Sequence, residues 1–337
     1  MTSGSGRAGL GRKIIAPALA VVLLAVGAHL WWNTNLLGRD DLCGGLVSAE
    51  SAEGVFSQAG RVSDRDGLDE QAGDRLAFSC VVETSSFLPG ADDEYLRIVG
   101  TRERGDFPFT DGGRWPSPVR MSFFSGGATG AIGAYHSWVL LPDACTTAKG
   151  PAIIEGYVPE GSDPVRVARL LTGIAGRAAE RADCAGGRPL TAPDALPAVP
   201  EPRPVEGGAV CGLDGLDFPG PEGSSGVREA VQDRAETVWS CEVERYATYV
   251  VTREPRIVAG IRSSPGYERQ PAVAGHQVSG FDARHVVADC AGTPTYFSME
   301  VGHDYLTARE GSDAPRAEDL FENFVDVAGA RFGCTAP

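Results

Sequence analysis

The chain is poor in lysine and histidine. Lysine occurs only at Lys13 and Lys149, so arginine supplies nearly all the basic residues, and the 337 residues include five histidines. The sequence contains no H-E-x-x-H pair, no C-x-x-C pair and no G-x-S-x-G turn. The motifs of zinc hydrolases, of most structural zinc sites and of α/β-hydrolases are therefore missing. We expect no catalytic, cofactor-binding or metal-ligating residues.

Positive charge is scarce as well. The chain has 30 basic residues against 45 acidic ones, which gives a formal net charge of −15. A surface this acidic repels phosphate backbones, and no basic patch opposes the repulsion. We therefore expect no nucleic-acid partner.

One apolar run stands near the start. Residues 14–32 read IIAPALAVVLLAVGAHLWW, which is long enough as a helix to cross a bilayer. We predict a transmembrane helix there, with residues 1–13 in the cytoplasm because basic residues directly precede the run. A cleaved signal peptide is the alternative, because Val26-Gly27-Ala28 has the small residues of a cleavage site. The membrane is thus an expected partner, and the rest of the chain is expected outside the cytoplasm.

All the cysteines follow this run, and their number is even. They are Cys43, Cys80, Cys145, Cys184, Cys211, Cys241, Cys290 and Cys334. An even number in an oxidising compartment indicates disulfides, and we favour pairing between neighbours in the sequence. A metal site is the alternative, but the spacing is not that of structural zinc sites.

The sequence also repeats itself. Glu160 to Cys184 aligns without a gap on Glu310 to Cys334, at an offset of 150, with nine of 25 positions identical. Both segments have apolar residues at helical spacing, and Asp163 and Asp313 are suitable N-caps. The alignment indicates an internal duplication.

These patterns predict an α+β fold. We expect two homologous domains, over residues 33–185 and 209–337, each an antiparallel sheet of about five strands packed by a C-terminal helix. Each domain should contain two disulfides. Residues 186–208 hold six prolines and should form an extended, semi-rigid linker.

Three features invite a chemical interpretation. Residues 126–136, GGATGAIGAYH, are similar to the nucleotide-binding turn of short-chain dehydrogenases, but a strand follows where that turn needs a helix. Residues 63–70, SDRDGLDE, are similar to a calcium loop with the ligand spacing broken. We interpret these as a flexible loop and a solvated turn. Glu155 and Glu300 each lie ten residues after a cysteine, which favours surface salt bridges over acid–base chemistry.

Three features together are similar to a known class of protein. They are the apolar run, the Arg/Ala/Gly bias, and the openings CGGL at Cys43 and CGLDGL at Cys211. The chain resembles actinobacterial (Streptomyces-like) single-pass membrane proteins with cysteine-bearing extracytoplasmic domains of unknown function. The resemblance implies a cell-membrane location and no particular activity. We expect a non-enzymatic binding or interaction module for an envelope protein or a wall ligand. An extracytoplasmic enzyme with an unrecognised site and a structural partner of another envelope protein remain alternatives.

Overall fold

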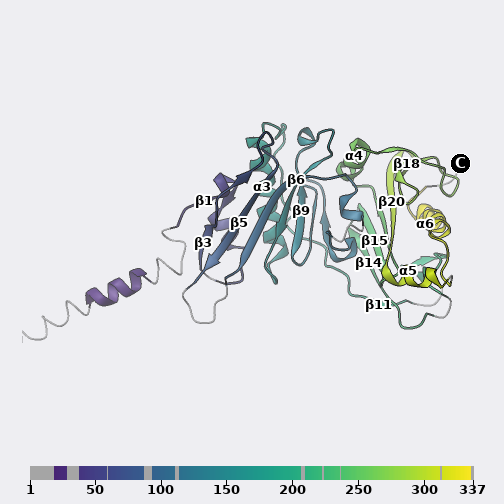
Figure 1. Cartoon of the computed structure of the whole chain (residues 1–337), viewed down its shortest axis with the longest axis horizontal. Coiled ribbons are helices and arrows are strands. Elements are labelled where there is room, and N and C mark those ends of the chain that lie inside the picture. The colour runs from purple at the N-terminus through teal and green to yellow at the C-terminus, as the bar shows by residue number, and fades with distance from the viewer. Residues whose placement is uncertain are drawn as a thin grey trace, which may run out of the picture.

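The computed structural model describes residues 19–28, 38–58, 60–86, 93–110, 114–205, 209–221, 224–235, 237–311 and 313–334. Two antiparallel sheets of eight strands each dominate the fold (Figure 1). The strands of the first sheet are β3 Arg61–Asp64, β4 Asp69–Glu70, β5 Phe78–Ser85, β6 Tyr95–Arg102, β7 Ser122–Phe124, β8 Gly130–Ile132, β9 His136–Leu140 and β10 Ala152–Tyr157. They lie in the order β3-β5-β6-β10-β9-β8-β7, with β4 beside β5.

The second sheet has a closely related order. Its strands are β11 Arg203–Pro204, β14 Arg228–Ala235, β15 Val238–Val243, β16 Ala247–Thr252, β17 Glu268–Arg269, β18 Val278–Asp282, β19 His285–Cys290 and β20 Thr293–Val301. They lie in the order β11-β14-β15-β16-β20-β19-β18-β17. The sequence β5-β6-β10-β9 of the first sheet therefore corresponds to β15-β16-β20-β19 of the second.

Smaller elements surround the sheets. The hairpins β1 Asp41–Leu42 with β2 Val47–Ser48, and β12 Ala209–Val210 with β13 Leu213–Asp214, flank the first cysteine of each half. The helices are α2 Ala49–Glu53, α3 Pro164–Arg181, α4 Pro255–Ser263, α5 His303–Glu310 and α6 Ala317–Arg331. The 3-10 turns are η1 Cys43–Gly45, η2 Phe107–Phe109, η3 Pro118–Arg120 and η4 Asp143–Cys145.

The predicted α+β content and the antiparallel strand pairing are confirmed, but the expectation of about five strands per sheet is wrong, because each sheet has eight. The additional strands are mostly short, such as β7 with three residues and β17 with two. Alternation of apolar and polar residues cannot be recognised over so few positions. The strand β17 pairs with the longer β18, whereas β7 pairs with β8, which also has three residues.

The predicted transmembrane helix over residues 14–32 is also wrong. Within that range the structure describes a helix at residues 19–28, and residues 14–18 and 29–32 lie outside the described part. Among the described residues, no helix combines the length and the hydropathy needed to cross a membrane.

The first residues of α3 and α6 differ in position although their sequences align. The helix α3 begins as predicted, because the Asp163 carboxylate accepts a hydrogen bond from the Arg166 N–H at 2.9 Å. Its counterpart α6 begins after Arg316 instead of Asp313. Pro315 lies between the two, and a residue that precedes proline is held away from helical geometry.

The segment that follows β16 forms the helix α4. Pro255 occupies the first turn, where a missing N–H costs little. The buried residues Ile257, Val258 and Ile261 follow at helical spacing.

Three apolar cores arrange these elements in four layers. One core joins α2 and α3 to the first sheet, and another joins α6 to the second sheet. The third, which we call the inter-sheet core, lies between the two sheets and joins the face of each sheet that is turned away from its helix. Alternation along β10 shows this directly, because Ile153 faces the inter-sheet core and Ile154 faces the α3 side. The two halves therefore pack against each other over their sheet faces, with α6 on the outer side (Figure 1).

Residues 186–205 of the linker contact both halves. The Ser122 hydroxyl of the first sheet donates to the Pro197 carbonyl at 2.7 Å. The Gln232 amide of the second sheet donates to the Ala198 carbonyl at 3.3 Å. The linker then enters the second sheet as β11. Residues 206–208 lie outside the described part.

A close backbone contact fixes the relative position of the halves. The Gly105 N–H donates to the Ser264 hydroxyl at 2.8 Å, at the end of α4. A Cβ on Gly105 would lie 2.2 Å from the Gly260 carbonyl carbon, which no side chain tolerates. Glycine at position 105 therefore allows the first half to rest on the backbone of α4.

Candidate functional site

The structure contains four disulfides: Cys43–Cys80, Cys145–Cys184, Cys211–Cys241 and Cys290–Cys334. These are the neighbour pairs that the repeat favoured, and all eight cysteines are used. Four disulfides indicate that the folded part of the chain matures in an oxidising compartment outside the cytoplasm.

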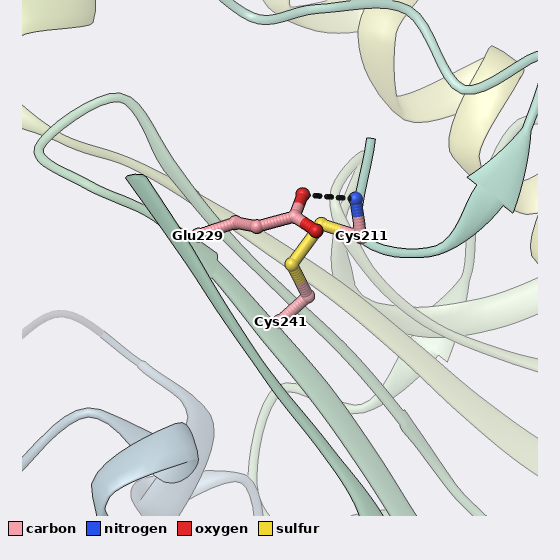
Figure 2. A group of neighbouring side chains, drawn as sticks. All are labelled: Cys211, Glu229 and Cys241. Carbon is pink, nitrogen blue, oxygen red and sulfur yellow. Dashed lines mark hydrogen bonds between the residues drawn. A yellow bond between two sulfur atoms is a disulfide. The ribbon is translucent and has the colours of Figure 1, made fainter. Parts of the chain in front are cut away.

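One group in the described part has the composition of a metal site. Cys211, Glu229 and Cys241 are buried, and their potential ligand atoms lie within 4.8 Å of one another. Figure 2 shows why the group does not hold a metal: the two sulfurs are bonded to each other, and the Glu229 carboxylate accepts the Cys211 N–H at 2.6 Å. A cysteine binds a metal ion as a thiolate, and a disulfide sulfur is not a thiolate.

The first half repeats this arrangement. There, the Asp64 carboxylate accepts the Cys43 N–H at 2.9 Å. The two carboxylates also occupy matching positions in the strand register. Asp64 lies opposite Val82, and Glu229 lies opposite Val243. Each of these valines lies two residues after a disulfide cysteine. Both accepted N–H groups belong to cysteines with positive φ, 53° and 60°. The carboxylates thus hold a strained backbone position beside each disulfide, and their role is structural.

We therefore expect a chelator to leave the thermal unfolding temperature unchanged, whereas reduction of the four disulfides should lower it by tens of degrees. Differential scanning calorimetry with EDTA and, separately, with a phosphine reductant checks this. A lower unfolding temperature in EDTA that added zinc restores would contradict the assignment.

The two sequence features that resembled ligand loops do not form sites. Gly126 to His136 spans β8 and the turns on either side of it, within antiparallel hairpins. That is not the strand–turn–helix that a dinucleotide needs. In residues 63–70, Asp64 binds the Cys43 N–H and Glu70 pairs with Arg181 at 2.8 Å. These carboxylates therefore do not converge on one point.

Glu155 and Glu300 are not equivalent, although both lie ten residues after a cysteine. The strand register shows this. In the first sheet Cys80 lies opposite Ile98, and Ile98 lies opposite Gly156. In the second sheet Cys241 lies opposite Tyr249, and Tyr249 lies opposite Met299. Gly156 therefore corresponds to Met299, and Glu155 corresponds to Ser298. Counting from a cysteine failed because the connections before the two strands differ in length.

Each glutamate nevertheless contacts a histidine. Glu155 is fully buried, not at the surface, and its Oε2 lies 3.2 Å from His136 Nε2. The His136 ring is stacked between Trp115 and Tyr157, with ring centroids at 4.4 and 4.3 Å. The Arg114 guanidinium closes the group by binding Glu155. The sequence carried no signal for this cluster, because its members come from three separate segments.

The second cluster belongs to β18, β19 and β20. His285 is 4% exposed, and both ring nitrogens are used: Nδ1 lies 2.8 Å from Asp282, and Nε2 lies 2.9 Å from Glu300. Burial opposes protonation of the ring, but the two carboxylates outweigh it and raise the pKa of His285 to about 9. The hydrogen bond to His285 lowers the pKa of Asp282 to about 2. His285 is thus a cation at neutral pH and has no nitrogen free to act as a base.

This cluster predicts a pH dependence of stability. Because the pKa of His285 is raised above its unfolded value of 6.5, the stabilisation is full below pH 6.5 and is lost as pH rises through 9. We expect the free energy of unfolding to fall by on the order of 3 kcal/mol between pH 6 and pH 10. Urea unfolding at several pH values measures it. The variant His285→Gln should show a flatter profile, and an equal fall in that variant would disprove the assignment.

One cavity is lined by residues of both halves and of the linker. It has a volume of about 550 Å³ and is bounded by η3, β7, the β8–β9 turn, the linker, β14 and β15. We call it the inter-sheet cavity. Its apolar lining consists of Val119, Ile132, Ala134, Val199, Ala230, Pro164, Pro200 and Pro202.

Charged residues border this cavity and are mostly paired. Arg120 of the first half contacts Glu242 of the second at 2.9 Å. Glu229 pairs with Arg203 at 3.0 Å, and the Glu244 N–H donates to the Arg228 carbonyl at 2.9 Å. The charged lining residues sum to one negative charge, and the rest of the lining is mostly apolar. Pockets of this kind are typical of small-molecule sites.

The chain matches no protein-family model, no curated protein and no solved structure among those compared with it. The resemblance to actinobacterial envelope proteins therefore stays a prediction, and function must be argued from the geometry alone.

Proposed function

We propose that this chain is a non-enzymatic, extracytoplasmic binding protein whose ligand occupies the inter-sheet cavity. One observation carries the proposal: a cavity of about 550 Å³ that both halves and the linker build together. The volume is in the range of small-molecule sites. The apolar lining favours a compact and largely apolar ligand, with a polar group directed toward Arg120 or Arg228.

The side chains near the cavity favour binding over catalysis. A general base needs an ionisable group that is free to take a proton near the bound molecule. His285 has both nitrogens bound, and His136 is stacked between two rings beside Glu155. Neither histidine lines the inter-sheet cavity.

The probe 8-anilinonaphthalene-1-sulfonate tests the proposal, because it combines an apolar ring system with one anionic group. Isothermal titration calorimetry should show saturable binding at one site per chain. The exposed residue Ala134 lines the cavity, so Ala134→Trp should fill it and weaken binding at least ten-fold.

Ala195→Trp is the matched control, because Ala195 is also exposed but lies in the linker outside the cavity. It should bind the probe as the unmodified protein does. Absence of saturable binding, or equal binding by Ala134→Trp, would refute the proposed site.

A further inference from the structure

A separate concave region lies between α3 and the segment 185–190 that follows it, and Arg256 of α4 in the second half also lines it. Two cavities of about 350 and 480 Å³ occupy this region, and they share Pro142 and residues 187–190 in their linings. We call the two together the α3 groove. None of its lining residues belongs to the inter-sheet cavity.

The floor of the α3 groove exposes helix backbone. Gly173 and Gly176 lie in the middle of α3, where glycine is less stable than alanine. The fold does not require them: a Cβ on Gly176 would meet nothing within 4 Å, and one on Gly173 would meet only the end of Arg177 at 3.6 Å. The aligned residues of α6 are Asn323 and Asp326. The two glycines therefore leave room for a molecule that approaches the helix closely.

A buried hydroxyl lies on the same helix. Thr172 lines the groove and is 3% exposed, and its Oγ1 has no hydrogen-bond partner among the described residues. Burying a hydroxyl without a partner costs free energy, and most buried polar atoms in proteins have one. A ligand with a polar atom over the glycine floor would supply the partner.

The charge of the groove is opposite to that of the chain. Its charged lining residues are Arg177, Arg188, Arg256, Asp143 and Glu180. They sum to one positive charge, in a chain of net charge −15. Asp143 is already engaged by Arg256 at 3.3 Å. Arg188 lines both cavities, is exposed, and has no ion pair in the described part of the chain.

We propose that the α3 groove binds a small ligand that carries a phosphate or carboxylate group. The anionic group binds at Arg188, because a guanidinium offers paired donors that match phosphate and carboxylate oxygens. The rest of the ligand lies over Gly173 and Gly176, beside Thr172. This site is independent of the inter-sheet cavity, so either proposal can fail alone.

Calorimetric titration of the full chain at low ionic strength tests the groove, with inorganic phosphate and citrate as separate probes. We expect saturable binding of at least one probe at one site. The variant Arg188→Gln should weaken this binding at least ten-fold. The tighter of the two probes identifies the anionic group as phosphate or carboxylate.

Two further variants separate a built site from general attraction of anions. Arg169→Gln removes the same charge from an exposed position on α3 outside the groove, so binding should change by less than two-fold. Gly176→Leu fills the floor with a residue that favours helix, so it should abolish binding without preventing folding. The proposal is overturned if neither probe saturates, if Arg169→Gln weakens binding as much as Arg188→Gln, or if Gly176→Leu binds normally.

Discussion

Replacing Trp138 with alanine should lower the free energy of unfolding by about 3–5 kcal/mol, as is usual for deletion of a large buried aromatic side chain. Trp138 is fully buried on β9 and faces the inter-sheet core. It contacts Phe107 edge-on, with ring centroids 4.9 Å apart, and Phe123 at 6.1 Å. The sheets on either side are held by many contacts and cannot close over the space left by an indole. The cavity therefore adds to the lost burial.

The effect of Trp138→Ala on hydrogen exchange should extend to both halves. Because the sheets share one core, Trp138→Ala should increase hydrogen exchange in β16 and β20 of the second sheet as well as in β9. Tyr135→Ala is a suitable control, since Tyr135 is 64% exposed on the neighbouring turn and should change stability by less than about 0.5 kcal/mol. Two separate unfolding transitions, with only the first-half transition shifted by Trp138→Ala, would show that the halves do not share a core.

The sequence predicted the features that short-range rules control. Asp163, Pro164 and the apolar spacing that follows determine where α3 begins, and a carboxylate that accepts a backbone N–H needs no distant partner. The disulfide pairing was also accessible, because the repeat placed four cysteines in each half. These features depend on segments that are near in sequence or that are copied at a known offset.

The packing of the halves could not be predicted, because it depends on which surface covers each sheet. One signal was present. All five residues of β9, His136 to Leu140, are buried, and their sequence HSWVL lacks the alternation of a strand with one face in water. A strand that is apolar on both faces requires a cover on each, and α3 can supply only one. The proline content of the linker predicts an extended chain but does not indicate which of its carbonyls accept hydrogen bonds from the two sheets.

The candidate sites were harder to predict than the fold. The inter-sheet cavity combines a 3-10 turn, a hairpin turn, two strands of the second sheet and prolines of the linker, and no motif joins them. The Glu155–His136 contact depends on the register between β9 and β10, which the turn between them determines. Side chains that meet only through register and packing leave no fixed spacing in the sequence.

Removal of the disulfide Cys290–Cys334, by replacing both cysteines with alanine, should lower the free energy of unfolding by about 4 kcal/mol. The disulfide spans 44 residues, and the entropy lost by the unfolded chain on closing such a loop accounts for this value. It joins the end of β19 to the residues after α6, so the C-terminal turn of α6 should also exchange its amide hydrogens faster.

The same reasoning makes a prediction for all four disulfides together. Their spans run from 30 to 44 residues, and loop entropy changes slowly with length, so the four double-alanine variants should differ from one another by less than about 1 kcal/mol. Guanidinium unfolding of each variant gives the comparison. If the Cys290 and Cys334 variant unfolded at the denaturant concentration of the unmodified protein, loop entropy would not be the source of stability here. The α6 layer would then hold to the second sheet by its apolar contacts alone, through Phe321 and Phe324.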